Sequence, residues 1–180
     1  FTYTVLVPLL LFLPVFIGGS ITVEATTEEI DRGTLELLRV APVTLHDVVD
    51  GKLAAAAGLA PIQAALWIVL LELNGTNVAN ALPLVALVAG LALVVCGLGA
   101  AVALVSPDRR AAQFLYSIAV LFVIGGTTLL PHGPVTAAAR LGIGSPATGD
   151  FLAVAGIGVL AVVVYAGLHW IVDRVDADAL

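Results

Sequence analysis

The chain has 180 residues, of which 61% are hydrophobic and only 11% are charged, a balance far from that of soluble domains. Thirteen acidic against seven basic side chains give a formal net charge of −6, which disfavours binding to the phosphate backbone of a nucleic acid. A single cysteine, Cys96, excludes both an internal disulfide and a cysteine metal site. Lipid is therefore the expected surrounding of most of the chain, and no nucleic-acid partner is expected.

Five apolar segments approach the length needed to cross a bilayer, whose hydrocarbon core requires roughly 20 helical residues. Short stretches that contain charged residues, Gly or Pro separate them. The fourth is the shortest, and a helix that extends back through Ala111 would lengthen it. The sequence thus predicts an all-α polytopic transmembrane helical bundle that forms a single domain over residues 1–180. The predicted spans cover residues 4–23, 53–73, 82–105, 114–130 and 151–172.

Basic residues predict the orientation of this bundle, because Lys and Arg accumulate in the cytoplasmic loops of membrane proteins. Six of the seven fall at alternate connections, and only Arg140 falls on the opposite side. The asymmetry predicts a multi-pass protein of the cell membrane with a cytoplasmic carboxyl terminus and an external chain start. The six residues on the cytoplasmic side are Arg32, Arg39, Lys52, Arg109, Arg110 and Arg174.

The long polar insertion at residues 24–52 lies between the first two predicted spans, on the cytoplasmic side. We expect two short helices there, separated by a proline, because each has a start signal. Thr26 with Glu29 matches the spacing of a capping box, and Thr44 with Asp47 matches it with a shorter carboxylate.

The first of these two helices has an apolar face and a charged face. Glu28, Arg32 and Glu36 follow one another at i, i+4 spacing, at which ion pairs each stabilise a helix by a few tenths of a kcal/mol. Gly33 costs roughly 1 kcal/mol in a helix interior, which favours a bend or the close approach of another backbone. Two interpretations remain open on pattern alone: a surface that docks onto another protein, and a helix that lies on the inner leaflet.

A resemblance to a known family lies in residues 29–52, which read EIDRGTLELLRVAPVTLHDVVDGK. They resemble the signature of ABC-2-type transporter permeases. In that family an acidic and basic stretch leads into Gly-Thr-Leu-Glu, a short apolar run, a proline, and a Gly-Lys before the next span. The family has six spans with this element between the second and third. The resemblance therefore implies that the five spans are the last five, with the first span upstream of residue 1.

The resemblance implies a membrane-spanning permease subunit of an ATP-driven ABC transporter, most often an exporter. It implies that residues 28–42 form a coupling helix on a separate ATPase, and that two permease copies assemble with two ATPase copies. ATP and Mg would be bound by the ATPase, because this chain has no GxxxxGK[ST] phosphate loop. No cofactor or enzymatic activity is expected in the permease itself. The implied coupling residues are Glu29, Arg32, Gly33, Thr34, Leu35, Glu36, Leu38, Arg39 and Pro42.

Ionisable residues near the predicted spans are candidates for function. Structural roles are the commoner outcome: Glu72 ends the second span near outer water, and Asp150 is placed to cap the last helix. His132 and His169 fall on opposite sides of the predicted bilayer, so we expect no shared metal site. Arg140 receives no assigned role.

Gln63, within the second span, either hydrogen-bonds another helix, which is commoner, or lines a translocation path. Residues 131–150 open with Pro131-His132-Gly133-Pro134 and continue through moderately apolar residues that are too few to span, so they are predicted to be re-entrant or interfacial. No HExxH motif or serine elbow indicates a catalytic residue. The alternative function is an integral membrane enzyme or scaffold whose 24–52 segment rests on the inner leaflet and works without ATP.

Overall fold

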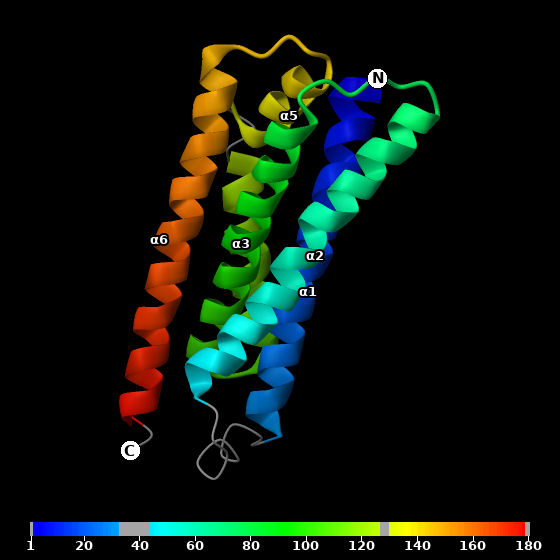
Figure 1. Ribbon diagram of the computed structural model, residues 1–180. Coiled ribbons are helices and arrows are strands. Elements are labelled where there is room, and N and C mark those ends of the chain that lie inside the picture. The colour runs from blue at the N-terminus through cyan, green and yellow to red at the C-terminus, as the bar shows by residue number, and fades with distance from the viewer. Residues whose placement is uncertain (1, 33–43, 127–129, 179–180) are drawn as a thin grey trace.

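A computed structural model describes residues 2–32, 44–126 and 130–178 of the chain. These residues form helices joined by short turns, with no strand among them (Figure 1). The predicted all-α bundle is therefore confirmed.

Four of the described helices are long and apolar enough to cross a membrane. They run side by side along one axis (Figure 1), and α3 packs against each of the other three. A short π-helical turn, η1 (Thr2–Leu6), leads into the first of them. The four long helices are α1 (Val7–Asp31), α2 (Leu45–Leu73), α3 (Ala81–Val105) and α6 (Thr148–Asp178).

The fourth predicted span, 114–130, is divided in the structure. It begins as α4 (Arg109–Val120) and continues as a π-helix, η3 (Leu121–Gly126). The expected extension back through Ala111 is confirmed, because the Asp108 carboxylate accepts a hydrogen bond from the Ala111 N–H at 2.8 Å and caps the helix start. Residues 127–129 lie outside the described part, so four helices of spanning length are seen there where five were predicted.

Of the two short helices predicted within residues 24–52, the described parts, residues 24–31 and 45–52, belong to the long helices α1 and α2, and residues 33–43 lie outside the described part. Helix α1 continues past residue 23 to Asp31, because residues 24–31 contain neither Gly nor Pro to end it. Thr26 lies in its interior with its side chain buried, so the predicted capping box at Thr26 is wrong. The box at Thr44 is confirmed: Thr44 Oγ1 accepts from the Asp47 N–H at 3.2 Å and Asp47 Oδ2 accepts from the Thr44 N–H at 2.9 Å. It starts α2 itself, which runs on without a break at Gly51.

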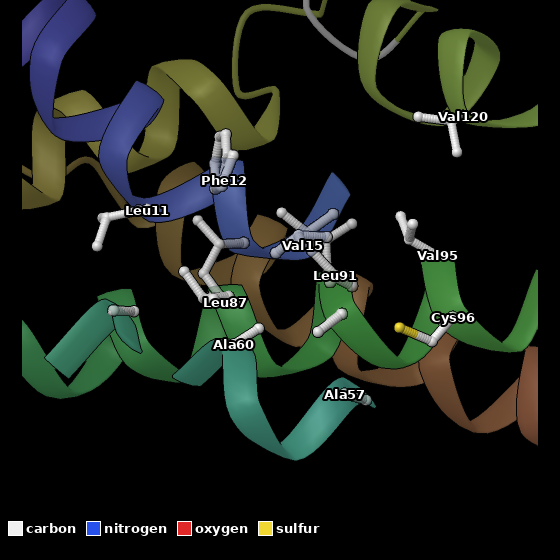
Figure 2. Packing of buried hydrophobic residues seen from close by; sticks show 14 of the residues in the cluster. Leu11, Phe12, Val15, Ala57, Ala60, Leu87, Leu91, Val95, Cys96 and Val120 are labelled. Carbon is white, nitrogen blue, oxygen red and sulfur yellow. The ribbon is translucent and has the colours of Figure 1, made fainter. Parts of the chain in front are cut away.

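The core is built on α3. Figure 2 shows Leu87, Leu91 and Val95 of α3 facing side chains from α1 and α2, among them Phe12 and Ala60. Glycines permit this close approach in lipid, where packing replaces the hydrophobic effect between helices.

Two glycines of α3 receive side chains of α6. A Cβ built on Gly90 would lie 2.8 Å from Ile157 Cγ2, and one built on Gly97 would lie 2.8 Å from Val164 Cγ1. Both pairs repeat at a spacing of seven residues, the period of left-handed helix packing. At two positions seven residues apart, the α3–α6 contact therefore places a β-branched side chain of α6 against a glycine of α3. We call these two contacts the glycine seam.

A short helix, α5 (Pro134–Gly142), lies beside the start of α1, at the end of the bundle where α2 ends and α3 begins (Figure 1). Its last carbonyls are satisfied by the α2–α3 turn: the Ala79 N–H donates to Gly142 O at 2.9 Å, and the Asn80 side chain donates to Leu141 O at 3.1 Å. This agrees with the prediction that residues 131–150 do not span. We call this end of the bundle the α5 end.

Candidate functional site

The opposite end of the bundle, where α1 ends at Asp31 and α2 begins at Leu45, is called the connection end. Figure 1 shows that α6 also ends there. The described basic residues divide between the two ends as the sequence predicts, with Arg140 of α5 alone at the α5 end. The basic residues at the connection end are Arg32, Lys52, Arg109, Arg110 and Arg174.

Ion pairs join the last turns of α1 to two other helices at the connection end. Lys52 Nζ of α2 pairs with Glu29 Oε2, and Arg109 of α4 pairs with Glu24. The predicted i, i+4 pair between Glu28 and Arg32 is also formed. Each pair is partly exposed and so contributes little stability, but together they tie the last turns of α1 to α2 and α4.

A cluster of titratable side chains joins α2 to α6 at the same end. His46 Nε2 lies 3.1 Å from Asp173 Oδ1, and the Tyr165 hydroxyl donates to Asp50 Oδ1 at 3.0 Å. The ring of His169 is 5.0 Å from that of His46, between centroids, and its Nε2 lies 3.5 Å from Asp50. Sequence reasoning missed this cluster. The signal that could have found it is the i, i+4 spacing. This spacing places His46 and Asp50 on one face of α2, and it places three residues on one face of α6, namely Tyr165, His169 and Asp173.

The residues implied to contact an ATPase fall into two groups. Glu29 and Arg32 lie at the end of α1, where each has an ion-pair partner. The other seven lie outside the described residues. They are Gly33, Thr34, Leu35, Glu36, Leu38, Arg39 and Pro42.

Gln63 lines a groove between α1 and α2 with a volume of about 320 Å³. Most of the lining is apolar, and the polar exceptions are Thr22, Lys52 and Gln63. Thr22 donates its hydroxyl to Gly18 O at 2.8 Å. The groove therefore presents one amide and one ammonium side chain along an otherwise apolar wall that reaches the connection end.

The α5 end holds a second polar cluster. His132 Nδ1 lies 2.9 Å and Arg140 Nη1 3.7 Å from Oδ1 of Asp150, whose side chain is fully buried. Asp150 Oδ2 also accepts the Ala147 N–H at 2.7 Å, which is the helix-capping contact expected of it. His169 lies nineteen residues further along α6, roughly 28 Å away by helix rise. The two histidines are thus at opposite ends.

Within the described part of the chain, no group of three or more His, Cys, Asp or Glu side chains is arranged to hold a metal ion. Glu72 is exposed near the end of α2. Cys96 is buried in the core of α3. Neither Glu72 nor Cys96 therefore belongs to the α1–α2 groove or to either of the two polar clusters.

Comparison with known proteins decides the family. Residues 1–143 match the family model described as ABC-2 family transporter protein. The chain belongs to the ABC-2 transporter family. No curated protein and no solved structure matches it. The match spans α1 to α5 and ends next to Gly142, the last residue of α5. This ABC-2 protein is a multi-pass membrane protein and a permease subunit of an ABC transporter.

Proposed function

We propose that this ABC-2 permease is an exporter subunit driven by a separate ATPase, and that residues 28–42 form its coupling element. The observation that carries the proposal is the network of contacts at the connection end. The Glu29–Lys52 pair closes the base of the segment, and the Glu24–Arg109 pair ties α1 to α4. The segment is therefore mounted on helices that are already fixed to one another.

This mounting supports rigid-body transmission. A force applied to residues 33–43 reaches α1 and α2 directly, since the segment connects the two helices. The contacts of His46 with Asp173 and of Tyr165 with Asp50 extend the connection from α2 to α6. Closure of an ATPase dimer would then move four helices as one body rather than bend a single loop.

The assembly would contain two permease copies and two ATPase copies, with the connection end in the cytoplasm. The excess of basic residues at that end supports this orientation. ATP and Mg would be bound by the ATPase chains. The permease would supply the membrane path and convert ATPase closure into helix movement.

Gln63 is the proposed polar element of the translocation path. A side-chain amide within a spanning helix is costly to expose to lipid, and Gln63 is half-buried in the α1–α2 groove. Lys52, at the connection end of that groove, is paired with Glu29. Movement of the coupling element would therefore change the electrostatics of the groove mouth as well as its width.

Co-purification and ATPase assays test the coupling role. The permease would be expressed in its native cells and purified through a tag on the permease, together with any phosphate-loop ATPase that it retains. We expect the ATPase to be retained and its ATP hydrolysis to change when the permease is present. Glu36→Gln and Gly33→Leu should each weaken retention. Glu72→Gln, the same change at the exposed end of α2, is the matched control and should not.

The alternative of an inner-leaflet enzyme or scaffold makes the opposite prediction. No ATPase would be retained by the wild type, and changes at positions 33 and 36 would leave activity of the protein intact. That result would remove the coupling role.

A further inference from the structure

Two cavities adjoin one another at the α5 end, away from the coupling segment and the Gln63 groove. One, of about 370 Å³, lies between η1 and α5 and includes Arg140 and Thr136. The other, of about 280 Å³, runs along α1 and is lined by apolar side chains, with Thr4 as the exception. Thr4 and Val135 line both cavities. They therefore form one groove with a polar head and an apolar tail.

The polar head contains a cation that lies against one buried carboxylate, that of Asp150. Arg140 Nη1 lies 3.7 Å from the fully buried carboxylate of Asp150 and 3.4 Å from His132 Nδ1. Both contacts use Nη1, while a guanidinium also has N–H donors on Nε and Nη2. The Arg140 side chain is 40% exposed and lines the cavity. Its fork is thus positioned for an anion that arrives from outside the chain.

The positive charge of Arg140 and the apolar tail beside it together indicate which kind of anion fits the groove. Arg140 is the one basic residue at the α5 end in the described part of the chain. Arginine is the side chain best suited to phosphate, because its planar fork forms two parallel hydrogen bonds. The tail cavity is lined by Leu9, Leu13 and Phe16, which are all exposed on α1. A free phosphate ion would leave this tail empty.

The length of the groove matches one leaflet. From Thr4 to Phe16 the helix rises roughly 18 Å, against about 15 Å for half of a hydrocarbon core. An acyl chain that enters at the membrane surface would therefore lie along α1 to the bilayer centre. The head of the groove would then stand at the headgroup level.

We propose that this groove binds one anionic phospholipid of the leaflet at the α5 end, with its phosphate on Arg140 and an acyl chain along α1. The lipid joins η1 and α1 to α5 at a surface where the protein alone leaves a gap. The proposal concerns the permease itself and does not depend on the ATPase or on the direction of transport.

Native mass spectrometry of the full chain tests the site. Delipidated permease in detergent would be titrated with phosphatidylglycerol, with diacylglycerol and with inorganic phosphate. We expect phosphatidylglycerol to be retained and diacylglycerol to bind at least tenfold more weakly. Arg140→Gln should weaken phosphatidylglycerol about tenfold to a hundredfold, the effect of one lost charge-assisted contact. Arg110→Gln, an exposed arginine at the connection end, should leave retention unchanged.

A second pair of variants separates loss of the site from loss of folding. Leu9→Trp fills the exposed tail, which Arg140 does not line, and should also weaken the retention of phosphatidylglycerol. Leu152→Trp makes the same change at a comparably exposed position of α6 and should not. Thermal unfolding of each variant would show that the bundle remains folded.

Three results would overturn the proposal. Equal retention by the wild type and Arg140→Gln would remove the phosphate contact. Displacement of phosphatidylglycerol by millimolar inorganic phosphate alone would reduce the site to an anion site without a tail. A photo-crosslinker at Leu9 that captures protein instead of lipid would show that another chain or a second copy covers the groove.

Discussion

Lys52 and Glu29 form an ion pair that joins the end of α1 to the start of α2, on either side of residues 33–43. The pair is about one-third exposed at Glu29 and less at Lys52. It therefore closes the base of the proposed coupling element without being deeply buried.

Exchange of these two charges tests the closure. Glu29→Lys should lower the free energy of unfolding by about 1 kcal/mol, the scale of a partly exposed pair that becomes a repulsion. It should also reduce ATPase coupling. Lys52→Glu added to Glu29→Lys should recover most of both losses in a double-mutant cycle. Glu72→Lys, the same charge reversal at an exposed position near the other end of α2, is the control and should leave coupling intact. A double variant no better than the single would contradict the assignment.

The cap at Thr44 determines where α2 starts. Thr44→Ala removes the acceptor for the Asp47 N–H and should cost about 1 kcal/mol. Amide hydrogen exchange should become faster in the first turn, Leu45–Val48, and remain unchanged near Leu73. Thr44→Ser keeps the hydroxyl and should retain protection. Equal exchange in all three proteins would show that packing, and not the cap, holds this turn.

The glycine seam between α3 and α6 makes a prediction about stability. Gly97→Ala places a Cβ 2.8 Å from Val164 Cγ1 and should destabilise the bundle by about 1–3 kcal/mol through overpacking. Val164→Ala in the same chain should restore stability, since it removes the atom that is met. Gly167→Ala, where an added Cβ meets nothing within 4 Å, is the matched control. Unfolding in mixed detergent would measure the free energy of unfolding of the wild type, the two single variants and the double variant.

Asp150 is the buried carboxylate at the α5 end. Asp150→Asn removes the negative charge next to His132 and Arg140 and weakens the cap on the Ala147 N–H. We expect a loss of about 2 kcal/mol, typical of a hydrogen bond to a charged group. Asp31→Asn, at an exposed position, should change stability little. A thermal shift no larger for Asp150→Asn than for Asp31→Asn would show that the cluster contributes nothing.

Local patterns were enough for several features of this permease. The long apolar segments predict spanning helices because burial of backbone polar groups in lipid requires them to be satisfied within the segment. The capping box at Thr44 and the Glu28–Arg32 pair followed from spacing over three or four residues. The position of Arg140 at the opposite end from the other described basic residues followed from the order of the predicted spans, because successive loops lie on alternate sides of the bilayer. The family resemblance, seated in residues 29–52, agrees with the family model.

Only the tertiary structure decided the remaining features, because they depend on how separate helices pack. Thr26 and Glu29 have capping spacing, yet Thr26 is buried in a longer α1 against the core. Glu24 meets Arg109 across 85 residues of sequence, and no local pattern indicates that pairing.

The sequence by itself determined a membrane-spanning, all-helical permease whose described basic residues, with the exception of Arg140, lie at one end, because bilayer partitioning acts on each segment separately. Packing of α1, α2, α4 and α6 decided which charges meet beside the proposed coupling element. It also opened the two-part groove beside Arg140, since a cavity exists only where neighbouring helices fail to fill the space between them.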